Sequence, residues 1–118
     1  MKIVAIIPAR MGSSRFPGKP LEKIDGKPMI GHVYDNVSEC QALTKTIVAT
    51  CDDEIHEYVQ SIEGEALLTS KEHERASDRC AEALIALEKK DQVKYDIVVM
   101  VQGDEPMINS KMIEQAIK

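Results

Sequence analysis

The chain has 118 residues, of which 43% are hydrophobic and 30% charged, the balance of one soluble globular domain. Its net charge of -5 argues against a protein whose main task is to grip nucleic acid through the phosphates. Aromatic residues make up only 3%, so the core must be aliphatic.

Cysteine usage and the apolar start of the chain indicate a cytoplasmic protein. The three cysteines form no CxxC pair, which argues against a disulfide framework or a zinc site and fits a reducing compartment. They are expected to be buried small residues. The apolar start is too short to span a membrane, and no signal-peptide cleavage pattern follows it. We therefore expect no nucleic-acid partner and no membrane partner.

The first predicted element is a strand followed by a loop. Lys2–Ile7 is a short run rich in Val and Ile, which predicts a strand that is buried on both faces and ended by Pro8. Glycine and proline punctuate the chain from there to Pro20, which is typical of a loop. Asp25-Gly26 is then a turn signal that fits the bend of a small hairpin.

Helices and strands alternate through the rest of the chain. Helical spacing of apolar residues begins at Pro28, and the acidic run Asp52–Glu54 favours the start of a second helix that ends at Gly64. The remaining predicted elements are the strands Thr46–Thr50, Ala66–Leu68 and Tyr95–Val101, the last of them strongly buried, and the helices Ser77–Lys89, with Cys80 or Ala81, Leu84 and Leu87 inward, and Ser110–Lys118. This alternation predicts an α/β fold with an open, mainly parallel sheet and helices on both faces. Because the chain stops inside a helical pattern, we expect it to be the front part of a longer protein.

Two loops combine unusual chemistry with a position after a strand. In an open parallel sheet, ligands bind beyond the carboxyl ends of the strands, where the strand order reverses. PARMGSSRFPGKPL follows the first strand, and VQGDEPMI follows the last. If both strands are central, the loops face each other across one crevice, with cations opposite Asp104 and Glu105. This arrangement suggests a triphosphate with Mg²⁺, which prefers one or two carboxylates together with phosphate oxygens.

The first loop is not the P-loop of an ATPase or GTPase. That motif needs four residues between its glycines, followed by Lys and then Ser or Thr. Five residues separate Gly12 from Gly18 here. Lys19 is followed by Pro20, which has no hydroxyl for a metal and no backbone N–H. The dinucleotide fingerprint GxGxxG is absent as well.

The motifs of the chain resemble those of one enzyme family. PARMGSSRFPGKPL, then GKPMI, IVAT and VQGDEPMI, in this order between Met1 and Lys118, closely resemble the CMP-Kdo synthetases, which are 3-deoxy-manno-octulosonate cytidylyltransferases. The broader group is the sugar cytidylyltransferases. The resemblance implies a Rossmann-like nucleotide-diphospho-sugar transferase fold, with residues 1–118 as the CTP-binding part of an incomplete cytidylyltransferase domain.

The resemblance also implies a reaction. CTP transfers its cytidylyl group to a 3-deoxy sugar acid, Kdo or a close relative, which gives CMP-sugar and pyrophosphate for bacterial lipopolysaccharide or surface-glycan synthesis. Mg²⁺ is the implied cofactor, and CTP and an acidic sugar are the implied partners. The full-length enzyme is expected to be a homodimer.

The family's site residues map onto this sequence by resemblance. Arg10 and Lys19 hold the triphosphate, with help from Ser13 and Arg15. Asp104 is the implied metal ligand and completes the catalytic set with Arg10 and Lys19. The implied nucleotide-binding residues are Pro8, Ala9, Arg10, Ser13, Arg15, Lys19, His73, Arg79 and Gln102.

One segment departs from the family pattern. The Kdo enzymes carry HxSGTxR, whereas residues 73–79 read HERASDR. Arg75 and Ala76 stand where Ser and Gly are usual, which leaves open another acidic sugar, such as a modified Kdo or an acylneuraminate. His73 could instead be an exposed helix-entry residue, and Arg79 could simply pair with Glu82. A chain of only this length could also be a non-catalytic nucleotide-binding module.

Overall fold

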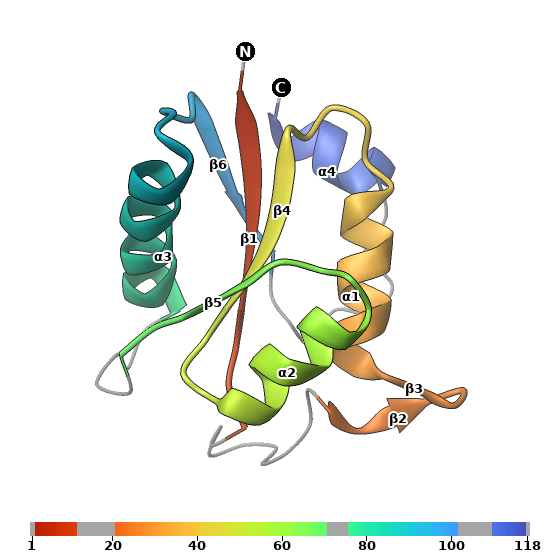
Figure 1. Cartoon of the computed structure of the whole chain (residues 1–118). Helices are drawn as coiled ribbons and strands as arrows, with labels where there is room; N and C mark the ends of the chain where they lie inside the picture. Colours follow the sequence, from red (N-terminus) through yellow and green to blue (C-terminus); the bar gives the residue numbers. More distant parts are fainter. Residues whose placement is uncertain (1, 12–20, 71–75, 102–109, 118) are drawn as a thin grey trace.

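The computed structural model describes residues 2–11, 21–70, 76–101 and 110–117 (Figure 1). The elements are β1 (Ile3–Ala9), β2 (Lys23–Ile24), β3 (Lys27–Pro28), α1 (Met29–Ser38), β4 (Lys45–Thr50), α2 (Asp53–Ser61), β5 (Ala66–Leu68), α3 (Ala76–Asp91), β6 (Ile97–Met100) and α4 (Ser110–Ile117). The predicted alternation of strands and helices and the α/β class are confirmed.

Four strands form one parallel sheet in the order β5-β4-β1-β6. β1 lies inside, with β4 on one side and β6 on the other. From β1 the chain extends the sheet through β4 to β5 and then crosses back to add β6. The strand order therefore reverses between β1 and β6.

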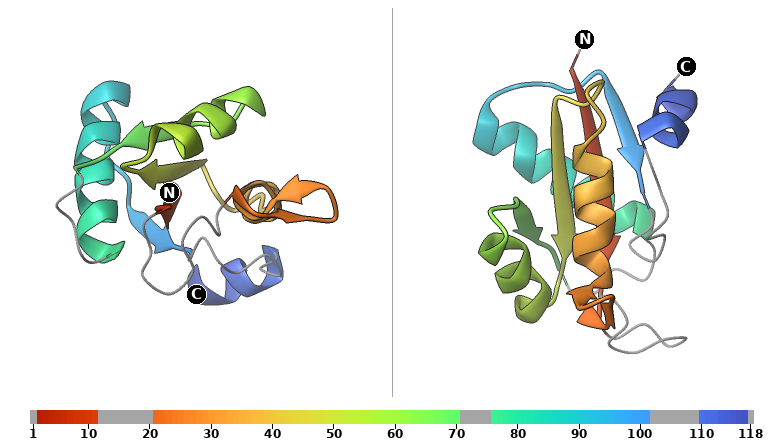
Figure 2. Two further views of the ribbon diagram at one scale, coloured as in Figure 1. Left: turned by 90° about the horizontal axis from the view of Figure 1, so that it is seen from below. Right: turned by 90° about the vertical axis from the view of Figure 1, so that its right-hand side faces the viewer.

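Helices cover both faces of the sheet, as predicted (Figure 2). Alternate side chains of β1 point to opposite faces and enter two separate core clusters. The α1-side cluster includes Ala5, Ile7, Met29, Ile30, Val33, Val48, Ile55, Val59 and Ile113, from β1, α1, β4, α2 and α4. The α3-side cluster is Val4, Ile6, Ile47, Ala49, Cys80, Ala83 and Leu87. Burying a large aliphatic side chain contributes roughly 1.5–3 kcal/mol, so these clusters hold the layers together with few aromatic residues. No helix in the described part of the chain is long and apolar enough to cross a membrane.

The Asp25-Gly26 turn closes a two-stranded antiparallel hairpin, as predicted. Both turn residues have positive φ, 53° at Asp25 and 80° at Gly26, as a type I′ turn requires. The N–H of Met29 donates to the carbonyl of Glu22 at 2.9 Å, so the hairpin leads directly into α1.

Pro8 does not end β1, contrary to the prediction, because the strand continues through Ala9. The carbonyl of Ile6 accepts the N–H of Val101 at 3.1 Å, so the even-numbered residues of β1 direct their backbone groups toward β6. The register between β1 and β6 stops at Ile6 and Met100, and the N–H that Pro8 lacks would have pointed beyond it. Pro8 therefore ends the pairing with β6, while the pairing with β4 continues.

β6 is shorter and more exposed than the strand predicted at Tyr95–Val101. Val98 and Met100 are 40% and 45% exposed. In the described sheet β6 pairs with β1 alone, which makes it an edge strand. Val98 and Met100 lie in register with Val4 and Ile6, on the α3 face, but α3 packs over β1 and β4 and leaves them uncovered. The prediction that this strand is strongly buried is wrong, because an apolar run does not show which elements cover the strand in the fold.

The end of α2 also differs from the prediction. The left-handed residue behind this helix is Glu63, with φ 61°, rather than Gly64. Gly64 meets a need for space instead, because a Cβ there would lie 2.8 Å from Val59 Cγ1. On α3, Cys80 is buried and Ala81 exposed, which decides the predicted alternative in favour of Cys80.

Candidate functional site

The predicted site lies at the carboxyl edge of the sheet, beyond the ends of the neighbouring strands β1 and β6 (Figure 1). β6 ends opposite Ile6, and β1 continues to Ala9. Arg10 follows β1 directly, and Val101 follows β6 directly. The strand order reverses between these two strands, which is where open parallel sheets bind ligands. The hypothesis that the two loops face each other assumed that both strands are central. β1 is central and β6 is its neighbour, but β6 is the edge strand of the described sheet, and most of both loops lies outside the described residues.

Only part of the predicted site falls in the described part of the chain. The described nucleotide-binding candidates are Pro8, Ala9, Arg10 and Arg79. The other predicted site residues, Ser13, Arg15, Lys19, His73, Gln102 and Asp104, lie outside the described residues, as do Arg75 and Glu105. Their roles stay predictions.

The described residues at the end of β1 include one charged side chain, that of Arg10. Pro8 and Ala9 are buried within the strand, so a ligand could meet them only through the backbone. Arg10 is exposed and forms no ion pair with another described residue. Its guanidinium offers five N–H donors in a planar fork, which suits phosphate oxygens.

Met11, the next residue, is held by Asp52. Its N–H donates to Asp52 Oδ2 at 2.8 Å, and its side chain packs against the α1-side cluster. The N–H of Asp52 donates in turn to Oγ1 of the fully buried Thr50 at 3.1 Å. The carbonyl of Thr50 accepts the N–H of Thr69 at 2.8 Å. Hydrogen bonds therefore run along the carboxyl edge from the end of β1 to the end of β5.

Arg79 extends this series of hydrogen bonds to α3. It is 3% exposed, and its Nη1 donates to Thr69 Oγ1 at 2.5 Å and to the carbonyl of Ser70 at 3.3 Å. The N–H of Ser70 donates to the Glu82 carboxylate at 3.2 Å. The first turns of α3 thus clamp the segment that follows β5. A buried guanidinium needs such partners, so Arg79 has a bridging task besides its predicted nucleotide contact.

Sequence reasoning missed Thr50 and Thr69 as residues of this edge. It favoured a helix start for Asp52 and left open a place near the site. The acidic run predicts a helix start, and Asp52 is the N-cap residue of α2, yet its side chain makes no capping hydrogen bond. The signal for a place near the site was the position of Asp52 directly after a predicted strand. A polar residue there lies at the edge where ligands bind.

The described residues carry no metal cluster, and the thiol of Cys80 is not reactive. Within these ranges no three His, Cys, Asp or Glu side chains lie close enough to hold a metal ion, and Asp104 lies outside them. Burial raises the pKa of the Cys80 thiol to about 11, although the Arg79 charge acts in the opposite direction. Cys80 is therefore protonated at neutral pH and is not a nucleophile. Cys40 is buried as predicted, whereas Cys51 is only half-buried.

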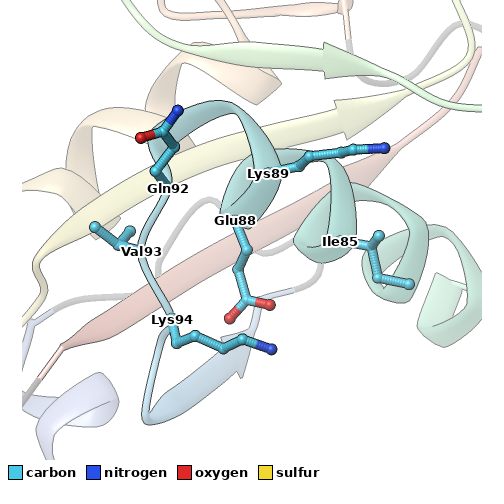
Figure 3. Close-up of a pocket in the computed structure, with 6 residues that line it drawn as sticks. All are labelled: Ile85, Glu88, Lys89, Gln92, Val93 and Lys94. Carbon is cyan, nitrogen blue, oxygen red and sulfur yellow. The ribbon is translucent and has the colours of Figure 1, made fainter.

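A hollow of about 550 Å³ lies at the opposite, amino edge of the sheet (Figure 3). It sits between the last turns of α3 and the segment that leads into β6. Its lining residues are Ile85, Glu88, Lys89, Gln92, Val93 and Lys94. None of them is a predicted site residue, so the hollow is separate from the candidate site.

A family model described as cytidylyltransferase matches residues 4–118. The chain belongs to the cytidylyltransferase family. The resemblance stated from the motifs is therefore confirmed, and with it the predicted class of nucleotidyltransferase. The comparisons also identify similar proteins within this family.

The chain is 50% identical to a 3-deoxy-manno-octulosonate cytidylyltransferase of Trichlorobacter lovleyi over 118 residues, 100% of this chain and 44% of the relative. It is 47% identical to an 8-amino-3,8-dideoxy-manno-octulosonate cytidylyltransferase of a Shewanella species, over 99% of this chain and 46% of the relative. A solved structure of CMP:2-keto-3-deoxy-manno-octonic acid synthetase complexed with CTP is similar, with a TM-score of 0.88 and 42% identity, over 99% of this chain and 46% of that one. The chain thus spans about half the length of these proteins.

Proposed function

We propose that residues 1–118 are the CTP-binding part of an enzyme that transfers a cytidylyl group from CTP to a 3-deoxy sugar acid. Family membership over residues 4–118 is the observation that carries the proposal. The names of the relatives supply two acceptors, 3-deoxy-manno-octulosonate and its 8-amino-3,8-dideoxy form. The proposal includes a role in lipopolysaccharide or surface-glycan synthesis, a cytoplasmic location and a homodimer for the full-length protein.

The position of Arg10 supports this function. It leaves the sheet where the strand order reverses, it is exposed, and no described residue neutralises its charge. A guanidinium can bind two phosphate oxygens at once. The predicted triphosphate contacts Ser13, Arg15 and Lys19 follow within nine residues of it in the sequence.

The proposed reaction is a displacement at phosphorus. A hydroxyl oxygen of the sugar bonds to the α-phosphorus of CTP, the bond from that phosphorus to pyrophosphate breaks, and the hydroxyl proton passes to water. Positioning and charge neutralisation supply most of the rate enhancement. Arg10 meets the phosphates as a bidentate fork and Lys19 as a point charge. Mg²⁺, with the Asp104 carboxylate as a ligand, would neutralise further phosphate charge.

Pyrophosphate release by the full-length gene product tests the proposal. In the presence of CTP and Mg²⁺, release should require one of the two octulosonates, and N-acetylneuraminate serves as the competing acceptor. Absence of release with every sugar acid would contradict the proposal. Asp104→Asn should abolish turnover without changing the circular dichroism spectrum. Asp53→Asn makes the same chemical change at an exposed helix start and should leave turnover intact.

A further inference from the structure

Asp52 stands at the N-cap of α2 but does not use its side chain as a cap. An N-cap aspartate usually accepts an N–H from the first turn of its own helix. Here the side chain makes no such bond, and Oδ2 accepts the N–H of Met11, 41 residues earlier in the chain, at 2.8 Å. The carboxylate therefore bonds the residue that follows Arg10 instead of the first turn of its own helix.

Hydrogen bonds fix the backbone of Asp52 at both its N–H and its carbonyl, which sets the direction of the carboxylate. Its N–H donates to Thr50 Oγ1 at 3.1 Å, and Thr50 is fully buried in the last position of β4. Its carbonyl accepts the N–H of His56 at 3.1 Å, the ordinary first bond of a helix. The start of α2 also favours the negative charge.

The end of β1 is held at the same point by packing. Ala9 is the last residue paired with β4, and the Met11 side chain packs against the α1-side cluster. Arg10 lies between them and is exposed. The Asp52 hydrogen bond fixes the amide on the far side of Arg10, so this arginine lies between a paired strand residue and a held amide.

We propose that Asp52 is a positioning residue for Arg10. By holding the amide of Met11, its carboxylate sets the direction in which the guanidinium leaves the sheet toward the phosphates of CTP. This inference rests on the proposed function of the site. In this role the Asp52 side chain only has to accept a hydrogen bond. The amide oxygen of an asparagine can accept it as well, whereas the methyl group of an alanine cannot.

Kinetics of three variants of the full-length protein test the inference. Asp52→Ala should raise the KM for CTP about tenfold, the effect of one lost hydrogen bond to a charged group, and leave the KM for the sugar acid unchanged. Asp52→Asn keeps an acceptor oxygen and should stay within about twofold of the wild type. Asp53→Ala removes the neighbouring, exposed carboxylate and should have no effect.

Three kinetic outcomes would overturn the inference: no change of KM in Asp52→Ala, an equal rise in Asp53→Ala, or an Asn variant as impaired as the Ala variant. Hydrogen exchange at the Met11 amide provides a readout that does not need turnover. Asp52→Ala should speed this exchange about tenfold relative to Asp52→Asn, and unchanged exchange would overturn the inference as well. An inactive wild type with the expected exchange pattern would sink the proposed function and leave the role of Asp52 in holding Met11 intact.

Discussion

At the amino edge of the sheet Lys45 lies between two carboxylates, whereas at the carboxyl edge Arg10 has no ion-pair partner among the described residues. Lys45 Nζ is 2.6 Å from Asp91 Oδ2 and 2.8 Å from Glu65 Oε2. At the carboxyl edge Asp52 accepts a hydrogen bond from a backbone amide, that of Met11. The amino edge therefore neutralises its own charges, while no described residue forms an ion pair with Arg10 at the carboxyl edge.

The pKa values at the amino edge reflect this mutual neutralisation. Burial acts to lower the pKa of Lys45, but the hydrogen bonds and charges of Asp91 and Glu65 outweigh it and raise that pKa above its ordinary value. The hydrogen bond from Lys45 lowers the pKa of Asp91 in return. Burial raises the pKa of Tyr95, whose hydroxyl lies 3.5 Å from Asp91 Oδ2. These groups stabilise the fold, and nothing in their arrangement reserves a charge for a ligand.

Arg10→Ala should have the largest effect on activity and is the strongest test of the contrast between the two edges of the sheet. We expect kcat/KM for CTP to fall about 10²–10³-fold, because a donor to the phosphate charge is lost. The free energy of unfolding should change by less than about 0.5 kcal/mol, since the side chain is exposed. Steady-state kinetics and urea unfolding check the two expectations. Lys2→Ala, which removes an exposed cation at the amino edge of the sheet, is the control. A similar loss of kcat/KM in this variant would contradict the contrast between the two edges.

Arg79→Ala tests whether the carboxyl edge also depends on its buried hydrogen bonds. The change leaves Thr69 Oγ1 and the Ser70 carbonyl without this donor, so the free energy of unfolding should fall by about 2–3 kcal/mol. Urea unfolding measures the loss. Lys89→Ala, an exposed position on the same helix, should change stability by less than about 0.5 kcal/mol. Equal stability of both variants would show that Arg79 is not a bridge.

Lys45→Met should destabilise the fold by about 1 kcal/mol, because a partly exposed ion-pair network contributes modestly. The KM for CTP should stay unchanged, since the change lies at the edge opposite the site. Urea unfolding and steady-state kinetics on the full-length protein measure the two effects. A KM shifted more than threefold would break the comparison between the edges.

The pH dependence of the destabilisation by Lys45→Met is the smallest of the expected effects. The pKa of Asp91 is lowered in the folded state, so its contribution is present above the ordinary aspartate value of about 3.9 and is lost as pH falls below it. The pKa of Lys45 is raised, so its contribution is complete below about 10.4 and is lost only at higher pH. The stability difference between wild type and Lys45→Met should therefore be constant from pH 5 to 8 and shrink toward pH 3. A difference that persists at pH 3 would contradict the assigned ion pair.

Local features of the sequence were sufficient to predict most of the elements and their order. Asp25-Gly26 demands positive φ at two successive residues, and the β-branched run at Thr46–Thr50 forms the expected strand. The apolar periods alternate in the order that produces a parallel sheet, whose carboxyl edge carries Arg10. The motifs around these elements indicated the family, because their residue types and their order along the chain resemble those of its members.

The sequence by itself determined the α/β class, the hairpin, the family and the placement of Arg10 behind the first strand. Only the tertiary structure decided that β6 is exposed on one face, that Pro8 lies inside β1, that Arg79 bridges to Thr69, and that Asp52 holds Met11. The physical reason is that periodicity and turn chemistry act between near neighbours in the chain. Strand order and register bring together residues as far apart as Met11 and Asp52, and neither can be read from a local pattern.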